Sequence, residues 1–575
     1  MRHFVVAVGA RFGLRLTIVL LAFLVNAPAA RAQMGGGGTG GGGMDGGGMG
    51  GGGTGGSATS LTRFTTADFS GSGNCATCHS GLVDAGSNDV SIDTHWRATM
   101  MANAGKDPLW QAKIASEINR NPSLKSIIEG KCSRCHMGMA RTQAVVDGTP
   151  VAVLSPGFLD PANPLHAAAM DGVSCALCHQ IEDVDLGTPV TFTGQYKIDT
   201  STSPPLRLAY GPFSQPLTQP MEMQVGFSPR QGAQTLDSDL CGSCHTLYTP
   251  IVDAAGNITG EFPEQTTYLE WRHATNGGGL DASCQDCHMP FALGGVAISN
   301  RPMGLTPREP FGQHHFVGGN SFMLGLLKAN ATALGVTAEP THLDLAIART
   351  DTQLRANAAA ITISGATLAA DVLSVSVSVQ NNTGHKLPTG IPARRAWLHV
   401  TVKDSKGAVF FESGKPLVNG SIAGNDADAD AAAYEPHYDR ITAPAQVQIY
   451  EPVLRAADGG VTYTLLRAVA YAKDNRLLPA GFAKETAAAD FAVVGAAAGD
   501  PSFAAGGDRI TYQVGAAGKR RPLSVTVELL YQSVGYRFAE DLRPEPSSEA
   551  KRFMQQYDAA TKAPRVMAAV TTSVR

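Results

Sequence analysis

A five-residue pattern, Cys-x-x-Cys-His, occurs five times in this chain. The copies are CATCH at 75–79, CSRCH at 132–136, CALCH at 175–179, CGSCH at 241–245 and CQDCH at 284–288. Together they use all ten cysteines of the chain, and every second cysteine is followed at once by a histidine. One chemistry, used five times, must therefore account for the cysteines.

This pattern is the attachment signature of c-type haem. The two thiols add to the vinyl groups on one edge of the porphyrin, and the adjacent histidine binds the iron as the proximal ligand. The sequence therefore predicts five covalently attached haem c groups. The predicted attachment residues are Cys75, Cys78, Cys132, Cys135, Cys175, Cys178, Cys241, Cys244, Cys284 and Cys287. The predicted proximal ligands are His79, His136, His179, His245 and His288.

Two other uses of paired cysteines explain the pattern less well. A zinc site takes four thiolate or imidazole ligands, which two Cys-x-x-Cys segments can supply, and exported proteins often form disulfides. Neither use requires a histidine directly after every second cysteine. The histidines therefore favour haem over zinc and over disulfides.

All five motifs lie between Cys75 and His288, so only a few tens of residues accompany each of them. That is too little chain to bury every haem in a protein core of its own. We therefore expect the haems to pack closely against one another. Close packing is the physical requirement for rapid electron hopping, so the arrangement itself predicts electron transfer.

The sixth iron ligands must come from elsewhere in the chain. Of fifteen histidines, five are proximal and His3 lies in the predicted signal peptide, so nine remain. Five bis-histidine haems are therefore possible. Such haems are usually electron carriers, whereas a methionine ligand would raise the potential and an open position would permit substrate chemistry. The distal candidates are His95, His166, His273, His314 and His385.

Three of these candidates lie close to a motif or to a predicted helix. His95 stands beside a tryptophan, with Met100 or Met101 as the competing ligand. His166 lies nine residues before the third motif, where a short helix could place it over a neighbouring iron. His273 lies eleven residues before the fifth motif, and a surface histidine at a helix end is its alternative interpretation.

The other two candidates lie beyond the last motif. His314 and His315 are adjacent, so in an extended segment they point to opposite sides, and we favour His314 as the ligand. His385 lies in the stiff Gly/Pro turn TGHKLPTG, where the later part of the chain could reach the haems. The lower-ranked histidines are His342 and His437, as substitutes for His385, and His399, which alternation places on the polar side of a strand.

Residues 1–32 have the features of a secretory signal peptide: a basic start, an apolar run at 16–25 and a small-x-small cleavage site at 30–32. An uncleaved membrane anchor is the alternative, although the run is short for one. No later stretch resembles a membrane span, so we expect none after cleavage. The formal net charge of −4 offers no basic surface for nucleic acid. The predicted location is periplasmic or extracellular, where c-type haem is attached.

The remaining pattern predicts an α+β multidomain chain. A Gly-rich flexible tether covers 33–60, and a loop-rich, mainly helical pentahaem cytochrome domain covers 61–350. Alternating segments such as VLSVSVSVQ, RAWLHVTV and RPLSVTVELLYQ predict a β-sandwich-like domain at 356–545. A C-terminal helix beginning near Ser547, followed by a tail, is expected at 546–575.

The chain resembles multihaem c-type cytochromes of the broad superfamily that contains hydroxylamine oxidoreductase and its tetrahaem cytochrome partner, in a subgroup with a C-terminal β domain. The matching segments are DGVSCALCHQIED, CGSCHTLYTP, CQDCHMP, HHFVGGNSFML and NNTGHKLPTG. The resemblance implies bis-histidine haems, with His385 completing a haem from outside the haem loops. The chain departs from the pentahaem nitrite reductases, which use a lysine in one motif, and from hydroxylamine oxidoreductase, which has more haems and a tyrosine-crosslinked one. Neither activity is carried over.

We therefore predict an exported cytochrome that passes electrons between redox partner proteins. One alternative is a multihaem oxidoreductase in which one open haem acts on a small nitrogen or sulfur compound. Another is a subunit of an extracellular haem filament, in which a histidine of one subunit completes a haem of the next.

Overall fold

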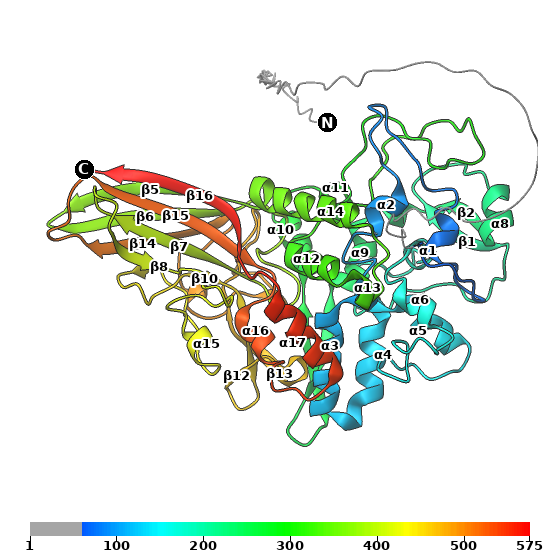
Figure 1. The fold of residues 1–575 in the computed structure, drawn as a ribbon, viewed down its shortest axis with the longest axis horizontal. Helices are drawn as coiled ribbons and strands as arrows, with labels where there is room; N and C mark the ends of the chain where they lie inside the picture. Colours follow the sequence, from blue (N-terminus) through cyan, green and yellow to red (C-terminus); the bar gives the residue numbers. More distant parts are fainter. Residues whose placement is uncertain (1–59) are drawn as a thin grey trace, which may run out of the picture. The chain divides into compact units, whose positions relative to one another are not determined.

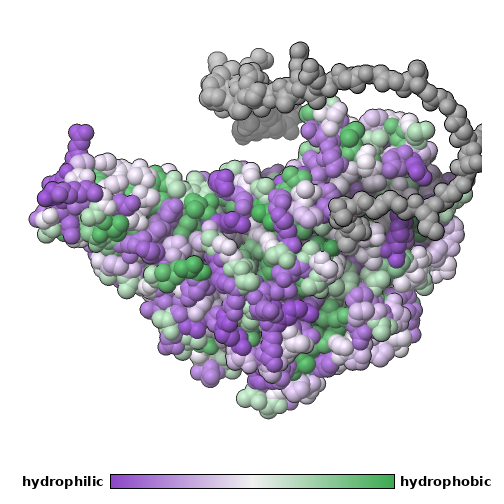
Figure 2. All heavy atoms as spheres, viewed as in Figure 1, coloured by the Kyte–Doolittle hydropathy of each residue, from purple (hydrophilic) through white to green (hydrophobic). Residues whose placement is uncertain are grey.

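The computed structural model describes residues 60–575, so the predicted signal peptide at 1–32 and the tether up to residue 59 lie outside the described residues. The described residues belong to one compact unit. Within them, no helix is both long enough and apolar enough to cross a membrane. Hydrophilic and hydrophobic residues are interspersed over the face drawn in Figure 2.

The first part of the described chain consists of short helices joined by irregular segments (Figure 1), as the sequence predicts. The α-helices are α1 (Ser72–Cys75), α2 (Ile92–Trp96), α3 (Pro108–Arg120), α4 (Lys125–His136), α5 (Gly138–Val146), α6 (His166–Met170), α7 (Cys175–Cys178), α8 (Gln219–Val225), α9 (Ser238–His245), α10 (Thr267–Asn276), α11 (Cys284–His288), α12 (Ser321–Ala329), α13 (Ala331–Leu334) and α14 (Pro340–Gln353). Two strand pairs lie among them: β1 (Arg207–Gly211) with β2 (Phe227–Gln231), and β3 (Leu247–Val252) with β4 (Ile258–Gln265).

The second part of the chain is dominated by antiparallel sheets. One sheet has the order β5-β6-β14-β9, and another has the order β10-β7-β15-β16 with β8 added beside β7. A third, small sheet has the order β12-β11-β13. The strands are β5 (Ala359–Ala369), β6 (Val372–Asn381), β7 (Arg395–Lys403), β8 (Val409–Ser413), β9 (Arg440–Ile441), β10 (Ile449–Tyr450), β11 (Pro452–Ala456), β12 (Val461–Thr462), β13 (Ala468–Asp474), β14 (Gly507–Gly515), β15 (Leu523–Gln532) and β16 (Arg565–Val574).

The alternation in the sequence decides which faces of the two larger sheets are buried. In β6 the residues Val375 and Val377 are buried while the serine between them is half-buried, and in β15 Val525 and Val527 follow the same rule. All four valines belong to one hydrophobic core that both sheets share. The predicted α+β class and the β-sandwich-like arrangement are therefore confirmed.

The C-terminal segment contains more structure than a helix and a tail. Helix α17 (Ser548–Ala559) begins after Ser547, whose side chain accepts a hydrogen bond from the Ala550 N–H, as expected for a helix cap. It packs against α3 and α12 in a core that includes Phe553 and Leu326. The following residues form β16, which pairs with β15 along its whole length. Few β16 side chains are buried, so its sequence carries little strand pattern, and backbone pairing holds it in place.

Candidate functional site

Each Cys-x-x-Cys-His motif is part of a helical turn. The second and fourth motifs form the ends of α4 and α9, the fifth motif is α11, and the third contributes all four residues of α7. The first motif begins at the last residue of α1, where the His79 N–H donates to the Cys75 carbonyl oxygen. Residues three and four positions apart lie on the same face of a helix. The two cysteines and the histidine of one motif therefore project to the same side, which suits a group that binds all three.

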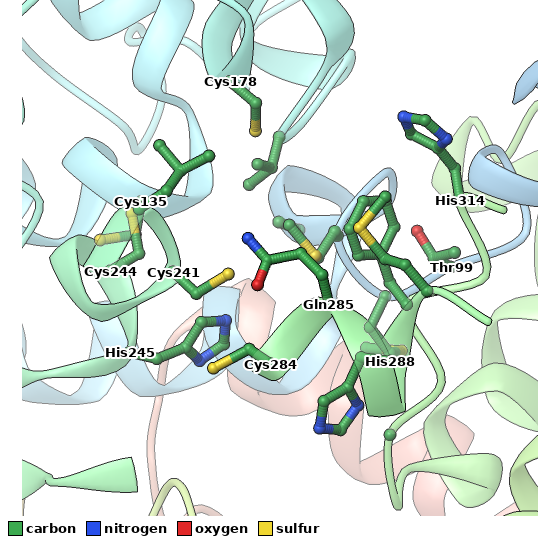
Figure 3. Close-up of a pocket in the computed structure, with 18 of the residues that line it drawn as sticks. Thr99, Cys135, Cys178, Cys241, Cys244, His245, Cys284, Gln285, His288 and His314 are labelled. Atoms are coloured by element: carbon green, nitrogen blue, oxygen red, sulfur yellow. The ribbon is translucent and has the colours of Figure 1, made fainter. Parts of the chain in front are cut away.

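The motifs open onto one continuous cavity. Its volume is about 1230 Å³, above the roughly 300–1,000 Å³ of ordinary ligand pockets. All five motif histidines and every cysteine except Cys78 line it, together with His314, His315 and His385. Figure 3 shows the cysteines of several motifs pointing into this space. All ten cysteines are free thiols, so the disulfide alternative has no support.

Thiols of different motifs lie next to one another, which gives the motifs a spatial order. The interacting thiol pairs are Cys75 with Cys175, Cys135 with Cys244, and Cys241 with Cys284. Cys178 also interacts electrostatically with Cys244. The contacts join the first motif to the third, the third to the fourth and the fourth to the fifth, while the second joins at the fourth. Figure 3 shows Cys135 beside Cys244, and Cys284 near Cys241.

Burial keeps several of the motif histidines neutral. It lowers the pKa of His136 and of His245 to about 4, and it also lowers the pKa values of His79 and His179. A neutral imidazole offers a lone pair to a metal, whereas a protonated one does not.

Backbone carbonyls fix the orientation of four of the five motif rings. In each case the Nδ1–H donates to a carbonyl oxygen, which leaves Nε2 free to bind a metal. The pairs are His79 with Ile298 (2.8 Å), His136 with Ala104 (3.1 Å), His179 with Tyr210 (2.5 Å) and His288 with Val317. This is the arrangement that metal-binding histidines usually show.

Two of the predicted distal histidines are paired with motif histidines. The ring centroids of His179 and His314 are 6.3 Å apart, with 27° between their planes, and those of His288 and His385 are 6.5 Å apart, with 15° between their planes. Two imidazoles that bind one metal through bonds of about 2 Å have centroids roughly 6 to 6.5 Å apart, because each centroid lies about 1.2 Å behind its nitrogen. Both spacings, and the cavity around them, fit a haem iron held between the rings.

His95 makes polar contacts through both of its nitrogens. Its Nε2 donates to the carbonyl oxygen of Asp89 at 3.0 Å, and its Nδ1 accepts from Arg349 at 3.1 Å. Its ring also touches the edge of the His315 ring, with centroids 4.5 Å apart. In this arrangement His95 presents no free lone pair to the cavity.

His166 and His273 lie outside the cavity lining. The Nδ1–H of His166 donates to the carbonyl oxygen of Phe158 at 2.8 Å. The Nε2–H of His273 donates to the carbonyl oxygen of Ala483 at 2.9 Å, and its ring packs against Phe482 with centroids 4.7 Å apart. The structure does not bring either residue together with a motif histidine.

The lower-ranked histidines also lie away from the cavity lining. His342 is on α14. His399 lies in β7 between two carboxylates, with Glu412 at 3.2 Å and Glu528 at 2.9 Å, which agrees with its predicted place on the polar side of a strand.

His437 belongs to a separate buried cluster with Asp500 and Asp508. Within residues 60–575 this is the one group of three or more potential metal ligands whose ligand atoms lie within 4.8 Å of one another, and it contains no cysteine, so the zinc alternative has no support. The Nδ1 of His437 accepts hydrogen bonds from the amides of Gln448 (2.8 Å) and Asn475 (3.1 Å). Backbone N–H groups hold the oxygens of both amides, so the proton of His437 is on Nε2, which donates to Asp500 at 3.1 Å. Neither nitrogen is free for a metal.

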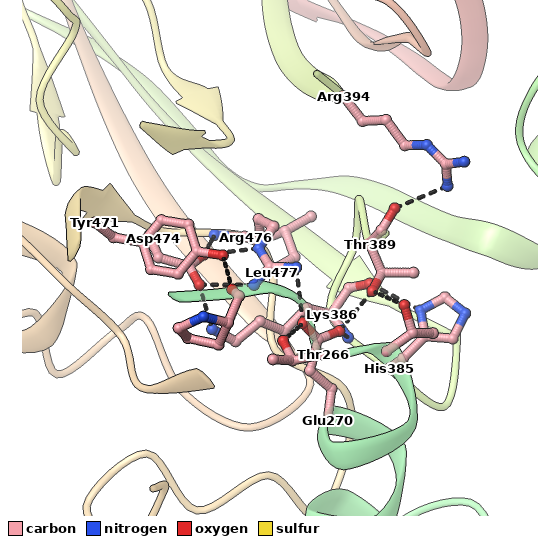
Figure 4. A network of polar contacts seen from close by, with 12 residues as sticks. Thr266, Glu270, His385, Lys386, Thr389, Arg394, Tyr471, Asp474, Arg476 and Leu477 are labelled. Carbon is pink, nitrogen blue, oxygen red and sulfur yellow. Dashed lines mark hydrogen bonds and ion pairs between the residues drawn. The ribbon is translucent and has the colours of Figure 1, made fainter. Parts of the chain in front are cut away.

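A buried ionic network adjoins the loop that carries His385 (Figure 4). Lys386 pairs with Asp474 at 2.7 Å, and Arg476 pairs with Asp474 at 2.8 Å and with Glu270 at 2.7 Å. The exposed fraction of each of these four side chains is 3% or less. Two cations and two carboxylates balance one another, which is the condition for burying such charges.

The same network attaches the His385 loop to α10, the helix that precedes the fifth motif. Glu270 on α10 accepts hydrogen bonds from the Thr389 hydroxyl at 2.6 Å and from the Lys386 N–H at 3.2 Å. The Asn381 side chain donates to the carbonyl oxygen of His385 at 2.8 Å. His385 is therefore fixed relative to the fifth motif by hydrogen bonds from both sides.

Neither this network nor the stacking of Trp110 on His136 is predicted by the sequence. The Trp110 ring stacks on His136, with centroids 4.4 Å apart and 6° between the planes. The network residues are far apart in the sequence and follow no spacing rule. Trp110 lies on α3, and the packing of α3 against α4 brings it next to the second motif.

A solved structure of a penta-heme cytochrome c552 from Thermochromatium tepidum is similar to this chain, with a TM-score of 0.49 and 17% sequence identity, over 87% of this chain and 97% of that one. No protein-family model and no curated protein matches this chain.

Proposed function

We propose that this chain is an exported cytochrome with five c-type haems that relays electrons between redox partner proteins. Haem supplies reversible one-electron chemistry when it is bound. The contribution of the chain is to hold five such groups around one cavity, with thiols of neighbouring motifs in contact. This contact between motifs is the observation that carries the proposal, because electron hopping requires short separations.

The order of the motifs gives the relay a branched form. The thiol contacts place the first, third, fourth and fifth motifs in series, with the second attached to the fourth. A branch gives three terminal positions, at the first, second and fifth motifs. Electrons would enter or leave the chain at these positions.

The sixth ligands that we propose are His314 for the haem of the third motif and His385 for the haem of the fifth. The ring spacings of 6.3 Å and 6.5 Å support both assignments. Burial lowers the pKa of His314 to about 3 and also lowers the pKa of His385, so both imidazoles are neutral. His95, His166 and His273 have no comparable support.

The test is to purify the exported protein, count its haems by mass spectrometry and pyridine haemochrome absorbance, and count spin states by low-temperature EPR. We expect five haems per chain, at least two of them low-spin. A protein that folds with no covalent haem, or with zinc in its place, would refute the proposal.

One observation favours the alternative of an open haem. Within residues 60–575 no second histidine ring pairs with His79, His136 or His245, and Trp110 rather than a histidine lies against His136. Such a position could bind a small substrate or accept a histidine from another subunit. A stoichiometric high-spin signal in a monomeric protein would favour the oxidoreductase. Filaments in negative-stain micrographs, with all haems low-spin, would favour the filament subunit.

The proposed location is the periplasm or the cell exterior. Its support is the signal-like segment at 1–32 together with the chemistry of c-type haem attachment. Cell fractionation of the native protein, with detection of the cleaved N-terminus, tests it.

A further inference from the structure

A buried carboxyl group on β4, Glu264, has no role in the proposed haem ligation. Its exposed fraction is 4%, and its side chain lines the cavity beside the second motif. It interacts electrostatically with Cys132, the first cysteine of that motif. A buried carboxylate is normally paired with a cation or held by several hydrogen-bond donors.

The charged neighbours of Glu264 are committed to other partners. Lys113 on α3 bonds Asp541 at 3.2 Å and the carbonyl oxygen of Tyr463 at 2.8 Å. Lys131 on α4 bonds Glu261 at 2.8 Å and the carbonyl oxygen of Tyr248. No ion pair involving Glu264 is found in the described part of the chain, so these lysines stabilise its charge only from a distance.

Two further titratable groups face Glu264, and neither stabilises a negative charge on it. Glu117 on α3 is a second buried carboxyl, but the N–H groups of Leu465 and Leu466 donate to it at 2.7 and 3.4 Å. Tyr471 on β13 also lies within electrostatic range. The Gln265 side chain is the hydrogen-bonding neighbour of Glu264. Of the two carboxyls, Glu264 is therefore the one that receives no backbone N–H hydrogen bond and no ion pair within the described residues.

We propose that Glu264 is a proton-binding site coupled to the redox state of the second motif: its carboxylate takes up one proton from solvent when the haem held by Cys132 and Cys135 gains one electron, and releases it on oxidation. The step balances, since one electron from a reductant and one proton from water leave the net charge of the site unchanged. This inference rests on the proposed function, because it requires a redox group at the second motif.

The physical reason is that a buried site resists a change in net charge. Burial, with the nearby charge of Glu117, raises the pKa of Glu264 to about 8. A ferric centre adds positive charge nearby and favours the carboxylate, whereas a ferrous centre does not. The proton affinity of Glu264 should therefore rise on reduction, and the potential of that haem should fall as the pH rises toward about 8.

The test is a spectroelectrochemical titration of the purified holoprotein between pH 6 and pH 9, for the wild type and for Glu264→Gln. In the wild type, the midpoint potential of one component of the redox titration should move by up to about 59 mV per pH unit, the shift for a one-electron, one-proton couple. In Glu264→Gln that component should lose its pH dependence and keep, at pH 9, the potential that the wild type has near pH 6. Asp371→Asn is the control: its side chain is 57% exposed, it pairs with Arg521 rather than with a lysine near Glu264, and it should leave the slope unchanged.

A wild type whose potentials do not change from pH 6 to pH 9 would overturn the inference, even if Glu264→Gln failed to fold. An unchanged slope in Glu264→Gln, with five haems and wild-type spectra, would also overturn it and would leave the electron relay intact. Absence of haem from the wild type would refute the proposed function instead. Proton uptake on reduction in unbuffered solution, measured with an indicator dye, should be smaller for Glu264→Gln than for the wild type.

Discussion

The buried ionic network beside His385 should contribute measurably to the stability of the protein. Asp474→Asn keeps the size of the side chain but removes one of two negative charges, so Lys386 and Arg476 are left with Glu270 alone. Removing one partner of a buried ion pair costs about 3–5 kcal/mol. We expect the free energy of unfolding at pH 7 to fall by that amount.

The pKa of Asp474 gives a second measure of the same interaction. Burial alone would raise it, but Arg476 and Lys386 hold the pKa at about 2, against an ordinary 3.8. A difference of nearly two units corresponds to roughly 2 kcal/mol. Because the folded-state pKa is depressed, this contribution is present above about pH 4 and is lost as the pH falls toward 2. The difference in the free energy of unfolding between the wild type and Asp474→Asn should therefore shrink as the pH falls over that range.

The assay is urea denaturation followed by far-ultraviolet circular dichroism, with midpoints compared at equal slope. Asp371→Asn is the control, because Asp371 and its partner Arg521 are 57% and 51% exposed, and it should cost under about 1 kcal/mol. The double variant Asp474→Asn/Lys386→Met restores charge balance and should be more stable than the sum of the single effects implies. A strictly additive double variant would refute the charge-balance reasoning.

Substitutions in three other parts of the structure should change the spin state of one haem or the stability of the protein. His385→Ala should convert one haem to high spin in the EPR spectrum, whereas His399→Ala should leave the spectrum unchanged. Burial raises the pKa of Asp508 to about 7, so the stability contributed by its protonated form is present below about pH 4 and is lost as the pH rises to 7. Asp508→Asn should therefore become more stable relative to the wild type as the pH rises from 4 to 8. The gain in the free energy of unfolding, obtained from denaturation midpoints, should reach up to about 4 kcal/mol. Phe553→Ala should destabilise the protein by about 3–5 kcal/mol in the same assay, because it opens the core that α17 shares with α3, and a loss under 1 kcal/mol would contradict that packing.

The sequence predicts those parts of the fold whose signal is local. The valine alternation in β6 and the serine cap of α17 both appear where expected, because each depends on neighbours two to four residues away. The strand β16 has no such signal, since pairing with β15 rather than side-chain burial holds it in place.

The same distinction applies to the candidate site. The motifs are contiguous, so the candidate attachment residues can be predicted from the sequence. The demand for imidazoles and the resemblance predict that His385 completes a haem, but its place opposite His288 comes from the structure. The network that positions His385 joins Glu270 to Asp474 and Arg476, and no periodicity connects residues so far apart.

The packing of α17 against α3 has a consequence for how the chain reaches its native state. Arg120 at the end of α3 bonds Glu545 just before α17, a contact between residues 425 positions apart. Contacts of such long range form late and slow folding, because a large loop must close before they contribute. The N-terminal part of the described chain therefore completes its packing only after the C-terminal part is available. Under the proposed function, the motifs stay accessible for covalent attachment of haem during that interval, so a longer interval favours complete attachment.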